Sequence, residues 1–99
     1  MSQLDQQQVK RDIASEVYQN DATLQAAVQK ISQSELQVRQ AEEARALAEV
    51  SYKSGSILNL DLLDSETLEA ESQLNLLKAQ SEYNISLFRL DISLGKLVY

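Results

Sequence analysis

Carboxylates are the side chains of this chain whose spacing could do chemistry. Five acids fall within residues 61–71 with no base among them: Asp61, Asp64, Glu66, Glu69 and Glu71. The chain contains no histidine and no cysteine, so the commonest general base and the softer metal ligands are missing. A carboxylate-bridged metal centre in a helical bundle ordinarily uses Glu-x-x-His pairs. We therefore expect Glu66, Glu69 and Glu71 to form a solvated face, or to line a larger assembly, rather than to form a metal site, and we expect no cofactor.

The remaining residues offer no catalytic constellation. We find no nucleophile–base pair, no phosphate-binding loop and no cofactor motif, so the sequence predicts that the protein is not an enzyme. The formal net charge of −6 argues against a nucleic-acid surface, because no basic stripe is available to replace the counterions of phosphates.

Two long stretches of the chain contain no proline and are rich in Ala, Leu, Gln and Glu, which mostly favour helix. A break in this helical pattern separates them, and the five acids follow the break. The break lies in Tyr52–Asp64 and contains Gly55, which can adopt the left-handed conformation that commonly ends a helix. Asn59 is a favoured N-cap for a second helix, and acids in its first turns complement the helix dipole. A connection this short folds the second helix back antiparallel to the first.

The pattern predicts an all-α fold with helices over about residues 4–54 and 60–94, forming a long antiparallel coiled-coil hairpin as one domain over residues 1–99. Gly95 is expected to end the second helix, with Leu97–Tyr99 starting an extended segment. Asn20–Thr23 is the weakest helical segment, where a bend or a local break would be tolerated.

Apolar residues recur mostly at steps of three, four and seven, as on one face of a helix. In the first helix this set is Leu4, Val9, Ile13, Val17, Leu24, Val28, Ile31, Val38, Ala41, Ala48 and Tyr52, with Glu35 where an apolar residue is due. The second helix carries two sets: Leu63, Ala70, Leu74, Leu77 and Phe88, and Leu76, Tyr83, Leu87, Leu90 and Leu94. Two sets on one helix predict packing on both flanks, as in a bundle or an α-barrel. Two helices alone bury too little apolar area, so we expect self-association, as a dimer or a larger assembly, or a longer parent protein.

The polar N-terminal residues lack the apolar core of a signal peptide, and no apolar run is long enough for a transmembrane helix. This leaves open that the chain is a piece of a secreted or membrane-attached parent.

The residues around the break carry a family resemblance. Tyr52-Lys53-Ser54-Gly55, Ser56-Ile57-Leu58 and Asn59-Leu60-Asp61-Leu62-Leu63-Asp64 resemble the pattern Y-x-x-G-x-x-S-x-L-D-L-L-D of the second helical hairpin in TolC-like outer-membrane efflux proteins. The flanking segments, from Val38 to Ala44 and from Leu77 to Leu97, are similar to the approaching and returning helices of that hairpin. Leu58 departs from the pattern, because many members place Ser or Thr there, so Asn59 or Ser56 is expected to cap the second helix.

The resemblance implies a fragment of a trimeric protein of the Gram-negative outer membrane. Its helical hairpins would build a periplasmic tunnel, and its tips would dock on a membrane fusion (adaptor) protein that links the tunnel to an inner-membrane pump. This chain would be one hairpin of the tunnel wall, without the β-barrel strands. The alternative function is the coiled-coil hairpin of a periplasmic adaptor, or another helical spacer.

The tip residues can be interpreted in two ways. Composition alone predicts a simple helix–helix turn, whereas the resemblance implies an adaptor-docking surface formed by Lys53, Ser54, Gly55, Ser56, Ile57 and Leu58. Apolar residues at an exposed turn favour docking, because they are costly unless something covers them.

Asp61 and Asp64 also have two compatible interpretations. Three residues apart, they lie on one face at the start of a helix, where the dipole favours negative charge. The resemblance implies in addition that they line the pore entrance, where copies would bring carboxylates together and attract cations.

Overall fold

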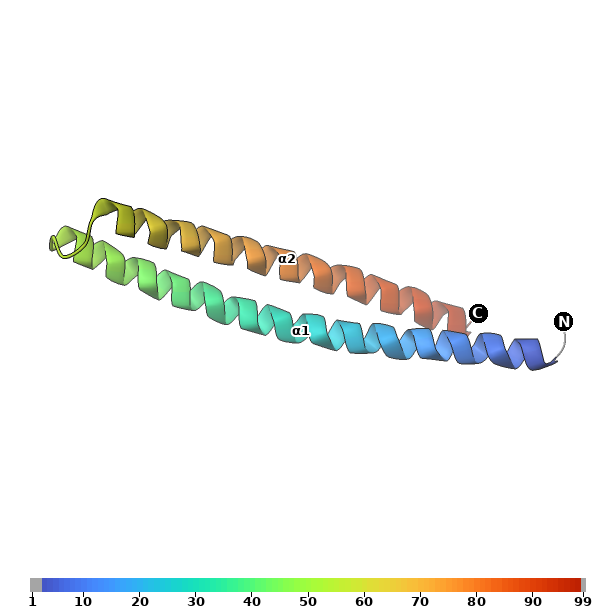
Figure 1. Ribbon diagram of the computed structural model, residues 1–99. Coiled ribbons are helices and arrows are strands. Elements are labelled where there is room, and N and C mark those ends of the chain that lie inside the picture. Colours follow the sequence, from blue (N-terminus) through green and yellow to red (C-terminus); the bar gives the residue numbers. More distant parts are fainter. Residues whose placement is uncertain (1–2, 99) are drawn as a thin grey trace. The chain divides into compact units, whose positions relative to one another are not determined.

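Residues 3–98 are described by the computed structural model, and they form two α-helices joined by a short turn (Figure 1). Helix α1 comprises Gln3–Lys53, helix α2 comprises Asn59–Val98, and residues 54–58 connect them. No strand occurs between residues 3 and 98. The predicted all-α helical hairpin is confirmed.

The predicted helix boundaries are correct to about one residue around the turn but wrong at the C-terminal end. Helix α2 continues through Gly95 to Val98, so residues 97 and 98 are helical, and Tyr99 lies outside the described residues. Gly95 does not have a positive φ angle and therefore does not form a left-handed helix end. Glycine inside a helix costs only about 1 kcal/mol relative to Ala, which contacts of the neighbouring residues can offset.

Residues 20–23 belong to the continuous helix α1, without a break. The Thr23 hydroxyl donates a hydrogen bond to the Gln19 carbonyl (3.0 Å), and the Gln25 side-chain amide donates to the Asp21 carboxylate (3.2 Å). The Asn20 side-chain amide donates to the Ser93 hydroxyl of α2 (2.5 Å). These contacts stabilise a segment whose intrinsic helix propensity is low.

The chain divides into two compact units. The turn unit comprises Lys30–Gln80 and contains the connection between the helices. The terminal unit comprises Met1–Gln29 and Ser81–Tyr99. Within each unit, a segment of α1 pairs with a segment of α2, as the side-chain contacts described below show.

In the turn unit, the buried and half-buried positions alternate at steps of three and four, the heptad spacing of a coiled-coil seam. These positions include Ile31, Ser34, Val38, Ala41, Arg45 and Ala48 in α1, and Leu62, Ser65, Glu69, Ser72, Leu76 and Ala79 in α2. Arg45 is hydrogen-bonded to Glu69, and continuing this register by one heptad puts Val38 level with Leu76. Layers of large residues thus alternate with layers of Ala and Ser, which permit close helix approach.

The terminal unit has a seam of the same kind, with Ile13, Val17, Asn20, Leu24 and Ala27 in α1 and Tyr83, Ser86, Leu90 and Ser93 in α2. The Asn20–Ser93 hydrogen bond defines its register, and the Lys96 ammonium donates to the Glu16 carboxylate (3.3 Å) beside it. Ser93, also bonded to the Arg89 carbonyl (3.0 Å), is only 1% exposed.

The predicted apolar stripes are partly wrong. In α1 the seam uses Ala27 and Ser34, whereas Val28 and Glu35 are exposed. The side chains of Leu4 and Leu97 lie outside the described residues. In α2 the seam takes Leu76, Tyr83 and Leu90 from one predicted set, but Leu87 and Leu94 from the same set are exposed. The other set, which includes Leu63, Leu74 and Leu77, is exposed throughout. Small polar residues occupy seam positions because their size allows the two helices to pack closely.

Candidate functional site

The end of α1 has the hydrogen-bond pattern of a Schellman motif. The Ser56 amide donates to the Ser51 carbonyl (2.8 Å), and the Gly55 amide donates to the Tyr52 carbonyl (3.0 Å). Gly55 has a φ of 81°, the left-handed conformation that side-chain-bearing residues rarely adopt. The turn is therefore a defined structure in which Gly55 is required by its backbone.

Hydroxyl groups add further bonds to this turn. The Ser54 hydroxyl lies 2.9 Å from the Ser51 carbonyl, to which it donates, and 3.0 Å from the Ser56 hydroxyl. Lys53, the last residue of α1, is exposed at the negative end of the helix dipole.

The start of α2 is capped by Asp61, not by Asn59 or Ser56 as the sequence predicted. The Leu58 amide donates to the Asp61 carboxylate (3.2 Å), and the Leu58 carbonyl accepts from the Asp61 amide (3.0 Å). Leu58 therefore occupies the N-cap position, and Asp61 supplies the acidic half of a capping box. Leu58 has no hydroxyl to complete the box, which leaves Asp61 as the side-chain cap. Asn59 became the first residue of the helix, where it makes no side-chain hydrogen bond within residues 3–98.

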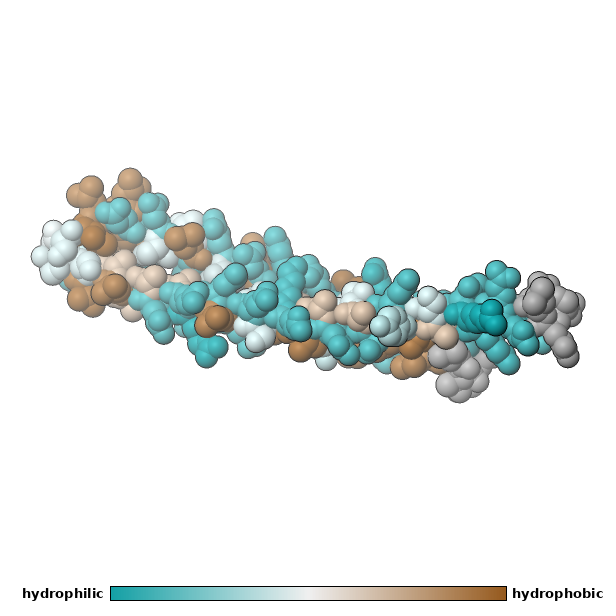
Figure 2. All heavy atoms as spheres, turned by 60° about the horizontal axis from the view of Figure 1, so that its bottom comes forward, coloured by the Kyte–Doolittle hydropathy of each residue, from teal (hydrophilic) through white to brown (hydrophobic). Residues whose placement is uncertain are grey.

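Apolar side chains lie uncovered around the turn (Figure 2). Leu58 is 73% exposed, Leu60 and Leu63 are also exposed on α2, and Ile57 is half-buried. In Figure 2, brown (apolar) spheres gather toward the end of the view that carries the turn. Exposed apolar groups held in place by hydrogen-bonded backbone are typical of an interaction surface.

The acids predicted to act together have separate environments. Asp61 is directed to the turn by its hydrogen bond, whereas Asp64, Glu66 and Glu71 are exposed and form no ion pair within residues 3–98. Glu69 lies in the seam, where only 17% of its side chain is exposed. The expectation of solvated carboxylates therefore holds for Glu66 and Glu71, although these two do not share one face of the helix, and it is wrong for Glu69.

Glu69 takes part in an ion cluster with Arg45 and Glu49; the sequence suggests that Arg45 pairs with neighbouring acids at a surface, whereas the structure places the pair in the seam. The Arg45 guanidinium donates through Nε to Glu69 and through Nη1 to Glu49 (2.7 Å). Hydrogen bonds to Glu49 and then to Glu69 raise the pKa of Arg45 above its ordinary value. Residue 45 stands at a seam position, four after Ala41 and three before Ala48. That spacing was the available signal, because a charged residue at a seam position requires a partner.

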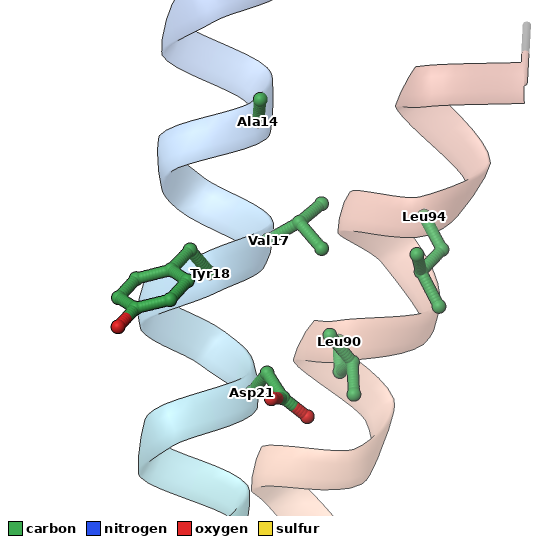
Figure 3. Close-up of a pocket in the computed structure, with 6 residues that line it drawn as sticks. All are labelled: Ala14, Val17, Tyr18, Asp21, Leu90 and Leu94. Atoms are coloured by element: carbon green, nitrogen blue, oxygen red, sulfur yellow. The ribbon is translucent and has the colours of Figure 1, made fainter.

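A second apolar surface lies in the terminal unit (Figure 3). Ala14, Val17, Tyr18 and Asp21 of α1 and Leu90 and Leu94 of α2 line an open groove. Val17 points toward Leu90 and Leu94, whereas the Tyr18 ring points away from α2. The lining is mostly apolar, and its polar side-chain groups are the Asp21 carboxylate and the Tyr18 hydroxyl.

Neither a metal site nor a membrane span is found within the part of the chain that the structure describes. No group of three or more His, Cys, Asp or Glu residues between residues 3 and 98 is arranged to hold a metal ion. No described helix combines the length and apolar character that crossing a membrane would require.

Comparison with known proteins adds one match. A family model described as outer membrane efflux protein matches residues 1–96. No curated protein and no solved structure matches the chain.

Proposed function

Because the chain belongs to the outer membrane efflux protein family, we propose that it forms one helical hairpin of a periplasmic tunnel wall and that its turn docks on an adaptor protein. In this proposal the parent is a trimer, and the adaptor connects the tunnel to an inner-membrane pump. The role is structural: the hairpin lines a conduit and presents a docking tip. Family membership also favours this function over the alternative adaptor hairpin.

The observation that carries the docking proposal is the uncovered apolar surface of a hydrogen-bonded turn. Leu58 is 73% exposed beside a hydrogen-bonded Schellman turn, and no atom other than those of the adjoining residues lies within 4 Å of the position that a Cβ would take at Gly55. The partner surface can therefore approach the backbone closely at Gly55. The docking residues are Lys53, Ser54, Gly55, Ser56, Ile57 and Leu58.

The proposal extends to the pore entrance. Asp61 and Asp64 lie in the first two turns of α2, next to the docking turn. Copies of the hairpin around a tunnel axis would place these carboxylates at the mouth, where they would attract cations. Asp64, which forms no ion pair within residues 3–98, is the better placed of the two for this role.

Substitutions in the full efflux protein test docking. Gly55→Arg and Ile57→Asp should abolish export and remove cross-linking of Ser56 to the adaptor, while the protein still reaches the outer membrane as a trimer. Ile57→Asp is the more informative change, since Arg at a positive φ also strains the turn by about 1–2 kcal/mol.

Gln40→Asp is the matched control, because Gln40 is exposed on α1 far from the turn in sequence. It adds the same charge and should leave export unchanged. Normal export and normal cross-linking by Ile57→Asp at wild-type protein levels would exclude docking through this turn.

A further inference from the structure

The small layers of the seam in the turn unit are alike in every heptad, so they do not define how far α1 is shifted along α2. Small residues recur every seven positions on both helices, namely Ser34, Ala41 and Ala48 in α1 and Ser65, Ser72 and Ala79 in α2. The register set by the Arg45–Glu69 hydrogen bond puts Ala41 level with Ser72. After a shift by one heptad, Ala41 would lie level with another small residue, Ser65 or Ala79. Packing of the small layers therefore does not distinguish these registers.

The serine hydroxyls of α2 in this seam do not define the register either. The Ser65 hydroxyl donates to the Leu62 carbonyl (2.7 Å), and the Ser72 hydroxyl donates to the Glu69 carbonyl (2.7 Å). Both bonds lie within α2, so they form whichever residue of α1 lies opposite. The hydrogen-bonding capacity of these small layers is thus satisfied without reference to the other helix.

Arg45 and Glu69 differ from the rest of this seam, since no other seam position named above for the turn unit carries a charge. Each stands where the neighbouring heptad has a large apolar residue, Val38 in α1 and Leu76 in α2. The Glu69 side chain is only 17% exposed. It accepts hydrogen bonds from Arg45 and from the side-chain amide of Gln73 (3.4 Å). Gln73 belongs to α2, so Arg45 is the partner that the other helix contributes.

A shift by one heptad in either direction would separate this pair. A charge inside the seam that loses its partner is destabilising. Glu49 would not replace Glu69 as a reporter of register, because it lies on α1 and stays beside Arg45 (2.7 Å) wherever α2 is placed. In the shifted registers each charged side chain would lie level with a large uncharged residue, namely Leu62 or Leu76 for Arg45, and Val38 or Tyr52 for Glu69.

We infer that the Arg45–Glu69 pair determines the register of α1 against α2 in the turn unit and thereby selects the residues that form the turn. Polar groups within an apolar seam are one means by which coiled coils fix their register. A shift by one heptad moves the middle of the connection by half a heptad along the chain. A shift toward α1 would remove Gly55 from the end of α1 and begin α2 near Ser56, a favoured N-cap residue. The pair thus positions the turn, whatever the turn binds.

Introduced cysteines report the register, because the chain has none of its own. Ala41, Ser65 and Ser72 are replaced by Cys in one chain. The thiol at position 41 is level with the thiol at 72 in the observed register and with the thiol at 65 after a shift by one heptad. The thiols at 65 and 72 lie two turns apart on one helix, too far to bond. The chain is oxidised at low protein concentration in a glutathione buffer, and peptide mapping by mass spectrometry gives the ratio of the two intrachain disulfides.

Moving the arginine by one heptad should move the register with it. Val38→Arg with Arg45→Leu places the arginine level with Glu69 only in the shifted register. Glu42 follows position 38 by four residues, as Glu49 follows position 45, so the acid on the same helix is retained. The ratio of the 41–65 disulfide to the 41–72 disulfide should rise at least about tenfold over that of the three-cysteine parent.

Two further variants distinguish pairing from a general loss of stability. Adding Glu69→Leu leaves the moved arginine without a partner on α2 in both registers, so the ratio should stay at the parent value. Adding Glu69→Leu together with Leu76→Glu restores the pair in the observed register and should also keep the parent ratio. Circular dichroism compares the helical content of all four chains.

Two results would overturn the inference. An unchanged disulfide ratio for Val38→Arg with Arg45→Leu would show that the pair does not determine the register. An equal rise in the variant that also carries Glu69→Leu would show that the helices have loosened, with or without loss of helical content, rather than followed the pair. Neither result bears on adaptor docking, which is measured separately by export in the full protein.

Discussion

At the scale of single residues, the two glycines have opposite roles. Gly55 ends α1 with a φ of 81°, whereas Gly95 lies inside α2 without a positive φ. Both positions have room for a methyl group, since no atom beyond the adjoining residues and the local helix backbone lies within 4 Å of a Cβ built at either. Backbone conformation alone therefore distinguishes them.

We predict that Gly55→Ala lowers the free energy of unfolding by about 1–2 kcal/mol, because Ala is strained in the left-handed conformation. Gly95→Ala should raise it by about 0.5–1 kcal/mol, because Ala is the better helix residue. Urea unfolding followed by circular dichroism measures both, and each variant is the control for the other. Equal effects of the same sign would contradict the assigned backbone conformations.

Asp61 has one role that the structure shows and a second that is proposed. It accepts a hydrogen bond from the Leu58 amide at the start of α2, and in the proposed tunnel it also faces the entrance. Substituting Asp61 therefore changes the stability of the helix in addition to any change in the passage of ions. Asp64 makes no such hydrogen bond, so a substitution at Asp64 distinguishes an effect on ions from the loss of the helix cap.

At the scale of the helices, α1 and α2 pair along a seam of apolar and small residues, and one layer of this seam is the ion pair of Arg45 and Glu69. Arg45 and Glu69 occupy a layer that is apolar one heptad away, where Val38 lies level with Leu76. The pKa of Arg45 is raised, so the stabilisation from its hydrogen bonds is fully present below the ordinary pKa and is lost only as the pH rises through the raised value. At neutral pH this contribution is constant.

We predict that Arg45→Leu and Glu69→Leu each destabilise the chain, and that the double variant is more stable than either. Arg45→Leu leaves the Glu69 carboxylate in the seam without its partner, and Glu69→Leu leaves Arg45 with Glu49 alone, whereas two leucines form an apolar layer. Midpoints of urea unfolding for all four proteins give the coupling.

Arg39→Leu is the control for this cycle, because Arg39 is exposed on the same helix and forms no ion pair within residues 3–98; we expect little change. Strictly additive effects of the Arg45 and Glu69 changes would show that the two side chains do not depend on each other.

At the scale of the whole molecule, the hairpin leaves much apolar surface uncovered in both units. The turn unit exposes Leu60, Leu63 and Leu74 on α2, and the terminal unit exposes Tyr18 and Leu94 at an open groove. Surfaces of this kind suit a hairpin with neighbours on its flanks. They agree with membership of a family of outer membrane efflux proteins.

We predict that Asp61→Ala with Asp64→Ala raises the ion conductance of the reconstituted full efflux protein, because a ring of carboxylates at the entrance retains cations and slows their passage. Planar-bilayer recordings measure the effect. Glu35→Ala with Glu43→Ala removes the same charge from exposed positions of α1 and should leave conductance unchanged. Unchanged conductance for the Asp variant as well would restrict Asp61 and Asp64 to their role at the helix start.

The sequence by itself determined the helices, their antiparallel connection and the place of the turn. These features follow from local physics: helix formers without proline, a glycine free to adopt positive φ, and acids at a helix N-terminus. They involve residues close together in the chain, so short windows of sequence contain the necessary information.

Only the tertiary structure decided which face of each helix is buried, which acid pairs with Arg45, and that α2 continues through Gly95. In α2 two apolar sets were nearly equivalent as candidates for burial. The buried face is the one whose small residues allow the helices to approach closely, namely Ser72, Ala79, Ser86 and Ser93. Burial depends on the shape of the opposing helix, far away in the chain, and the order of residues along one helix does not contain that shape.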